Sequence, residues 1–158
     1  MAIDNARTCP EQFRRDGFHP VMFERAQTYE IGITDQVVFL EHYAAYAVSG
    51  VASLASGDSV SPSNFLGVAV SPAGSASAGV NSSGDAKVRL VRPGACLWLG
   101  FWAKVADGAL ATADGGTVKQ FNGAGLSIHG DTTATNFGVK ILLVDVSNGY
   151  AFGHFSAV

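Results

Sequence analysis

Short stretches in which apolar and polar residues alternate dominate this chain, and a period of two predicts strands rather than helices. Residues 28–34 and 86–91 show this alternation, and the polar positions of the second stretch are basic. A strand with one face in the core and the other in water has this pattern. Residues 137–145 and 150–158 alternate in the same way. The Asn-Gly pair between them predicts a tight hairpin.

Other strands are predicted from apolar or β-prone runs that end at turn residues. Residues 64–70 lie between Pro62 and Pro72, and their apolar run is typical of a buried strand. Residues 43–51 are ambiguous, because their alanines favour a helix whereas the Ser-Gly pair near their end favours an extended segment. The remaining expected strands are residues 36–40, 95–105, 117–121 and 126–129.

The count is therefore about nine short strands separated by turns, with no convincing helix longer than two turns. This pattern predicts a mainly β protein, built as a compact β-barrel or β-sandwich. We expect one β-rich body over residues 28–158. Residues 71–84 are almost all Ser, Ala and Gly, so we expect a low-complexity loop there.

Residues 1–27 differ from this body and are expected to form an extended N-terminal arm. Their apolar residues follow neither period for long, and Pro10, Gly17 and Pro20 interrupt any helix. A short helix over residues 10–16 is possible, with proline in its first turn. The arm could wrap its own body or dock on a neighbouring molecule, and the sequence leaves both open.

The composition adds a second indication, because charge is scarce. Charged residues make up 15% of the 158 residues, against roughly 25% in an ordinary soluble domain. Eleven of the first 41 residues are charged, whereas residues 42–84 contain only Asp58. A chain with so little charge often covers much of its surface in an oligomer or a larger assembly.

The distribution of charge and hydropathy also argues against two classes of partner. The net charge is −3 and no basic stripe is present, so we expect no nucleic-acid partner. No run of about 18 apolar residues occurs, so we expect no membrane partner. The first residues carry charge where a signal peptide would be apolar, which predicts synthesis in a cytoplasm without signal-led secretion.

The residue types that carry chemistry are present but not clustered along the chain. Cys9 and Cys96 are far apart and lack metal-ligand spacing, so either two reduced thiols or one disulfide between arm and core is compatible with the sequence. Asp107 and Asp114 lie in Asp-Gly turns and are interpreted as turn formers. No nucleophile elbow or phosphate loop is found. We therefore predict no catalytic residue, no cofactor and no metal, and we do not expect an enzyme.

The four histidines, by the same reasoning, are expected on the surface or on strand faces. No two of them have the spacing of a metal-binding motif. They are His19, His42, His129 and His154.

Three large aromatic residues, Trp98, Phe101 and Trp102, lie within five positions of one another. In a strand, alternation places Trp98 and Trp102 on one face and Phe101 on the other. One face would fill the core, and the second would belong either to the core or to a subunit interface.

The order of several short motifs resembles the capsid decoration, or cement, proteins of tailed bacteriophages. Residues 65–69 read Phe-Leu-Gly-Val-Ala, a loop of small residues follows, and Gly84-Asp85 then precedes the alternating stretch 86–91. Glycine turns come next, at Gly94, Gly108 and Gly115-Gly116. The resemblance covers roughly residues 48–145.

What the resemblance implies is a virion structural protein on the outside of a capsid. Such a protein would form homotrimers, bind the major capsid protein and stabilise the shell where neighbouring capsid proteins meet. Its N-terminal arm would supply part of the contact. The arm residues that could make this contact are Phe13, Arg14, Arg15, Phe18 and Phe23.

Other functions remain open from the residues alone. A different virion component, such as a head fibre base or a tail protein, would also be β-rich and oligomeric. A carbohydrate-binding β-sandwich would use Trp98 or Trp102 as an exposed stacking platform. A hydrolase is disfavoured because its motifs are missing.

Overall fold

The computed structural model describes residues 6–20, 28–34, 37–74, 86–91, 100–122 and 125–158. This part of the chain is built from strands, with two single-turn 3-10 helices at Glu11–Phe13 and Thr112–Asp114 and no α-helix. The mainly β prediction is therefore confirmed. The strands are β1 (His19–Pro20), β2 (Thr28–Gly32), β3 (Val38–Phe39), β4 (Ala44–Val48), β5 (Val51–Leu54), β6 (Phe65–Ala69), β7 (Ala73–Gly74), β8 (Lys87–Val91), β9 (Phe101–Ala106), β10 (Val118–Asn122), β11 (Ser127–Thr133), β12 (Phe137–Asp145) and β13 (Tyr150–Ala157).

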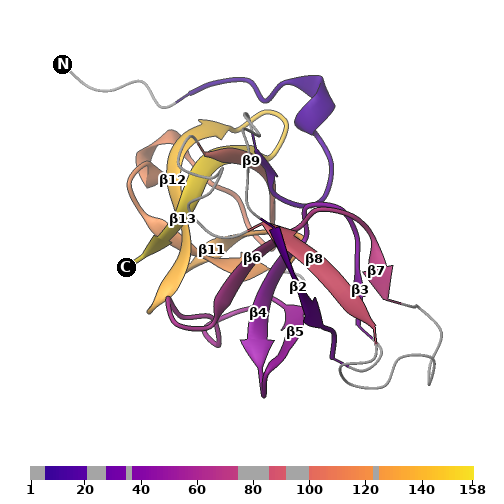
Figure 1. Ribbon diagram of the computed structural model, residues 1–158. Coiled ribbons are helices and arrows are strands. Elements are labelled where there is room, and N and C mark those ends of the chain that lie inside the picture. The colour runs from indigo at the N-terminus through magenta and orange to yellow at the C-terminus, as the bar shows by residue number, and fades with distance from the viewer. Residues whose placement is uncertain (1–5, 21–27, 35–36, 75–85, 92–99, 123–124) are drawn as a thin grey trace.

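Five of these strands form a closed ring of paired strands. The order is β9-β11-β10-β12-β13, and β13 pairs again with β9. The pairs are antiparallel except for β11 and β9, which run parallel. The ring lies in the upper part of Figure 1, with the hairpin of β12 and β13 in orange to yellow. Since β13 pairs with β9, the ring closes, and β1 pairs with the part of β9 that β11 does not reach.

The longest ladder of the ring joins β12 and β13, as the Asn-Gly signal predicted. The pairing runs from Asp145 opposite Tyr150 to Phe137 opposite Ala157, with a register shift between Ile141 and Leu143. Gly149 closes the turn with a φ of +75°, a conformation that glycine adopts at no steric cost. The predicted strands 137–145 and 150–158 are therefore confirmed almost to the residue.

The second sheet has the order β2-β8-β6-β4-β5 and is antiparallel throughout. It lies below the ring in Figure 1, and the small sheet of β3 and β7 lies beside it. The ambiguous residues 43–51 become the start of the hairpin β4–β5. Ser49 and Gly50 form its turn with φ values of +50° and +82°. Two positive values are the signature of a hairpin turn whose twist matches that of its strands.

Two hydrophobic clusters fill the molecule, and β4 and β6 contribute to both. Ala44 and Val68 belong to the larger cluster, which also contains the inward residues of the ring. Ala45 and Ala69 belong to the smaller cluster together with Val88 and Leu90, so β6 is buried on both faces. This explains its unbroken apolar run.

The strand predicted at 86–91 is present as β8, with exposed and buried residues alternating as predicted. Two other predictions of local structure are met only in part. The helix considered at residues 10–16 is reduced to the single turn at Glu11–Phe13. The loop predicted at 71–84 contains the short β7, and its residues 75–84 lie outside the described part.

Candidate functional site at the seat of the N-terminal segment

Residues 6–20, here called the N-terminal segment, lie on the ring and are paired with it at both ends. At the start, the Arg7 N–H donates to the Val144 carbonyl at 3.2 Å. At the end, β1 pairs with β9, placing His19 opposite Trp102. Figure 1 shows the indigo segment crossing above the ring before it turns down beside β9. The sequence left open whether the arm wraps its own body or docks on a neighbour, and residues 6–20 pack on their own body.

A buried carboxylate anchors the first half of the segment. Asp145, at the end of β12, is 3% exposed and accepts hydrogen bonds from the Cys9 N–H at 2.7 Å and from Asn148 at 2.8 and 3.1 Å. Burial alone would raise the pKa of Asp145, but these hydrogen bonds and the nearby Arg14 outweigh it and lower the pKa. The ionised form of Asp145 is therefore the one that holds Cys9.

Cys9 itself is a buried free thiol. Burial raises its pKa to about 11, and the neighbouring Asp145 adds to the effect. A thiol in this environment is a poor nucleophile, so Cys9 acts as a packing residue. Its possible partner in a disulfide, Cys96, lies outside the described residues.

Phe18 anchors the second half of the segment by entering the aromatic core. Its side chain is fully buried. The ring centroids of Phe101, Phe155 and Phe121 lie 5.1, 5.4 and 5.6 Å away. Phe18, which the sequence offered as a capsid contact, is therefore a core residue here. Its position explains why the segment cannot leave without opening a cavity in the ring.

Next to Phe18, two histidines that are 23 residues apart meet in a hydrogen bond. The His19 Nδ1 and His42 Nδ1 atoms lie 2.8 Å apart, and the two imidazoles cross at a centroid distance of 4.8 Å. His42 lies just before β4 and has a φ of +69°. Its carbonyl accepts the Phe18 N–H at 2.8 Å, so main chain and side chain both join the segment to the second sheet.

The positions of the protons follow from the partners of this pair. His19 Nε2 lies 2.8 Å from the Asp16 carbonyl oxygen, which only accepts, so Nε2 carries the proton of a neutral His19. His19 Nδ1 is then an acceptor, and His42 Nδ1 must be the donor. His42 Nε2 is left without a proton, 3.1 Å from the Glu41 carboxylate. That contact becomes a hydrogen bond only when His42 takes up a second proton.

Both imidazoles are held in the neutral form around pH 7. Burial lowers the pKa of His42 to about 4, and the His19 ring and Arg15 add to the effect. Burial also lowers the pKa of His19. Glu41 favours the charged form of His42, but its side chain is 52% exposed, so water screens this attraction and burial prevails.

A surface groove of about 360 Å³ opens beside the histidine pair. Leu40, Tyr43 and Pro72 give it an apolar wall, and Arg15 and Glu41 add charge of both signs. Leu40 is 47% exposed. The groove can accept a side chain with an apolar stem and a polar end, which is the kind of contact found at the rim of a protein interface.

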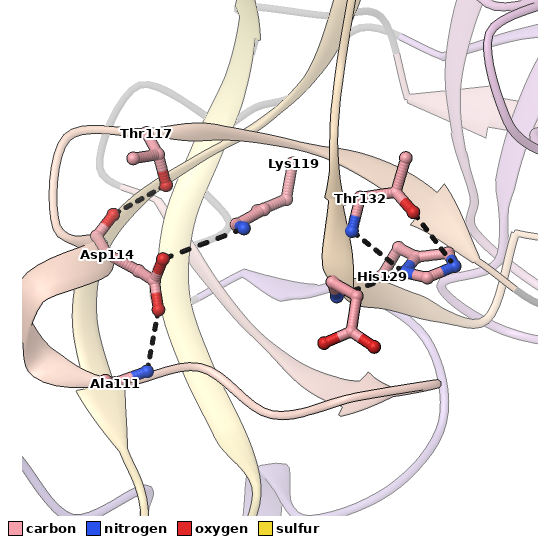
Figure 2. Close-up of polar contacts among 7 residues, drawn as sticks. Ala111, Asp114, Thr117, Lys119, His129 and Thr132 are labelled. Atoms are coloured by element: carbon pink, nitrogen blue, oxygen red, sulfur yellow. Dashed lines mark hydrogen bonds and ion pairs between the residues drawn. The ribbon is translucent and has the colours of Figure 1, made fainter.

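A second polar cluster, apart from the N-terminal segment, supports the loop before β10. Figure 2 shows the Asp114 carboxylate between the Ala111 N–H, at 2.7 Å, and the Lys119 ammonium, at 3.6 Å. Lys119 is 6% exposed. The hydroxyl of Thr117 donates to the Asp114 carbonyl at 2.6 Å. As predicted, Asp114 is a turn former, and it also compensates the charge of a buried lysine.

Of the other two histidines, His129 also has a local structural role. Its Nδ1 accepts the N–H groups of Asp131, at 3.2 Å, and Thr132, at 3.1 Å. His129 and His154 are half-buried on strand faces, so the prediction holds for them. His19 also lies on a strand, β1, but the residue is only 2% exposed and its ring is hydrogen-bonded to His42, which the sequence did not indicate.

The remaining residues singled out in the sequence fall into three groups. Arg14 and Arg15 are exposed and Phe13 is half-buried. Phe101 and Trp102 are buried within this chain, at 0% and 6% exposure. Trp102 packs on Phe152 with a centroid distance of 5.5 Å, so its ring is not presented as a platform. Phe23 and Trp98 lie outside the described residues.

In the described part of the chain, no three or more His, Cys, Asp or Glu side chains are arranged to hold a metal ion. Within the same residues, no helix has the length and hydropathy needed to cross a membrane.

Comparisons with family models, with curated proteins and with solved structures give no match to this chain.

Proposed function

We propose that this chain is a virion structural protein that binds the outside of a tailed-phage capsid and stabilises the shell at contacts between major capsid proteins. The observation that carries the proposal is the way the N-terminal segment is held. Asp145 anchors it at Cys9 and the aromatic core anchors it at Phe18. Residues 11–16 between these anchors are presented outward as a charged loop.

The side chains of this loop fit a contact with another protein. Arg14 and Arg15 are exposed, and arginine binds carboxylates through two parallel hydrogen bonds. Arg14 also donates to the Cys9 carbonyl at 2.9 Å, which limits its freedom and lowers the entropic cost of binding. The half-buried Phe13 in the same stretch, and the exposed Leu40 that lines the groove with Arg15, add apolar area.

Two features of the whole chain support the same proposal. Only 15% of the residues are charged, which suits a protein that covers part of its surface in an assembly. The motif order of residues 48–145 resembles that of decoration proteins, and several of those motifs fall on β6, β8 and the turns that follow. A homotrimer would let three weak contacts act together.

The test uses undecorated shells of the major capsid protein from the phage that carries this gene. We expect the wild-type chain to sediment with the shells and Arg15→Glu to lose at least about tenfold in affinity, since the reversed charge repels a carboxylate partner. Lys87→Glu, an equally exposed reversal on β8, is the matched control and should bind normally. Absence of wild-type binding would refute the capsid function, and equal binding by Arg15→Glu would refute the role of the loop.

The oligomeric state is tested separately by light scattering. A homotrimer has a molar mass of about 49 kDa, three times the 16.3 kDa of one chain. A mass of one chain at micromolar concentration would contradict the trimer and would leave the low charge content without this explanation.

A further inference from the structure

The His19–His42 contact is the feature that the proposed function does not use. It joins β1 to the chain just before β4, and it is formed by two groups that titrate near physiological pH when they are exposed. Gly17 and Phe18 are fixed at the same place by main-chain hydrogen bonds of 2.8 Å to the carbonyls of Leu126 and His42. The pair therefore lies where the segment enters the core.

We propose that the His19–His42 pair is a pH-sensitive switch that holds residues 17–20 on the ring at neutral pH and releases them when both rings are protonated. A neutral pair shares one proton between two Nδ1 atoms that are 2.8 Å apart. In a doubly protonated pair, both Nδ1 atoms carry hydrogen, so the hydrogen bond becomes a contact between two donors with two positive charges. Residues 17–20 can relieve it only by moving.

The charged groups around the pair do not remove this conflict. Arg15 is a cation on the same segment and opposes protonation of both rings. Glu41 lies 3.1 Å from His42 Nε2 and can stabilise one imidazolium. Asp16, the other carboxylate on this side, lies 4.0 Å from the Lys104 ammonium on β9, and Tyr43 feels its charge. The charge of Glu41 also favours protonation of His19, so a single carboxylate faces two imidazolium charges.

The direction of the pH effect follows from the shifts. In the docked state the pKa of each histidine is lowered, to about 4 for His42. In the released state both histidines return to about 6.5. Docking is therefore fully stable above about pH 6.5 and weakens as the pH falls towards 4, because the released state binds more protons.

Amide hydrogen exchange of the intact chain measures this release directly. The Phe18 amide donates to the His42 carbonyl, whereas the Ile141 amide donates to the Thr117 carbonyl within the ring. Between about pH 7.5 and pH 5, protonation of one histidine in the released state can raise the equilibrium constant for release by up to about 30-fold. Protonation of both can raise it by up to about a thousand-fold. We expect the protection factor of the Phe18 amide to fall by up to that amount and to stay below that of Ile141 at both pH values, because release of the segment costs less free energy than opening of the ring.

Variants show which groups are responsible. His42→Asn keeps a donor near the position of Nδ1 and suits the positive φ of this residue, but asparagine cannot be protonated. In this variant the protection factor of the Phe18 amide should therefore fall by only about 30-fold or less. His19→Gln tests the other ring in case the first variant folds poorly. His154→Asn, outside the pair, is the control and should behave like the wild type.

Three results would overturn the proposal. These are a constant protection factor for Phe18 between the two pH values, equal protection factors for Phe18 and Ile141 showing that the segment leaves only when the whole ring opens, and an equal loss of pH dependence in His154→Asn. No capsid is needed for any of these measurements, so their outcome is independent of the proposed function.

Discussion

The two hydrophobic clusters of this protein are filled in different ways. The larger one contains Phe18, Phe65, Phe101, Phe121 and Phe137 among its buried members, whereas the smaller one contains a single phenylalanine, Phe39, together with three alanines. The larger cluster draws its phenylalanines from the ring, from β6 and, through Phe18, from the N-terminal segment. The buried members of the smaller cluster are otherwise aliphatic.

The difference shows that the N-terminal segment is part of one core and not of the other. Within the smaller cluster every buried residue lies between Ile33 and Leu90. The larger cluster draws on residues from Phe18 to Ala151. A change in the segment should therefore act on the larger cluster, and a change confined to the smaller cluster should leave the segment in place.

The largest effect is expected from Phe18→Ala. Removing this buried ring should lower the free energy of unfolding by about 3–5 kcal/mol, measured by urea denaturation. It should also expose the Cys9 thiol to a thiol reagent, because the segment loses one of its two anchors.

The matched control for this change is Leu90→Ala in the smaller cluster. It should lower the free energy of unfolding by about 2–5 kcal/mol while Cys9 stays protected in the folded protein. Equal exposure of Cys9 in the two variants would show that the cores are not separate.

A smaller effect is expected from Asp145→Asn, which weakens the other anchor. An amide cannot accept all the hydrogen bonds that reach this carboxylate, so the free energy of unfolding should fall by about 1–3 kcal/mol at pH 7.

The pH dependence of this change is also defined. The pKa of Asp145 is lowered below its ordinary value of 3.8 in the folded protein. Its contribution is therefore present above the unfolded pKa and is lost as the pH falls below about 4 through the folded pKa. The wild type should lose stability in that range and Asp145→Asn should lose less, as urea denaturation at a series of pH values can measure. Identical curves for the two proteins would contradict the anchor.

The smallest effect is expected from the surface pair on the second sheet. The Arg89 guanidinium lies 2.7 Å from the Glu30 carboxylate across β2 and β8, and both side chains are about half exposed. Arg89→Ala should change the free energy of unfolding by less than about 1 kcal/mol. A larger loss in thermal or urea denaturation would mean that this sheet depends on its exposed face and not only on its small aliphatic core.

Most strands could be predicted because each carries its own pattern. The alternation in 86–91 and 137–145, and the Asn-Gly turn before 150–158, depend only on neighbouring residues, and these elements are present almost as expected. The sequence left residues 43–51 ambiguous because their alanines suit both structures, and tertiary packing decided in favour of the hairpin β4–β5.

The candidate site could be predicted only in part. Phe18 was recognised as an important arm residue, but its place in the core depends on Phe101, Phe121 and Phe155, which are distant in sequence. Lys119 gave no signal of burial, because the Asp114 carboxylate that accompanies it reaches it through the path of the loop.

The sequence by itself determined the β class, the position of most strands and the scarcity of charge, since these follow from local periodicity and composition. The tertiary structure alone decided that the ring closes, that the two cores are separate, and that His19 meets His42. The physical reason is that a period of two specifies which face of a strand is apolar but not which strand lies beside it. The histidine pair depends on such a choice, because β1 pairs with β9 and thereby brings His19 to His42, two residues before β4.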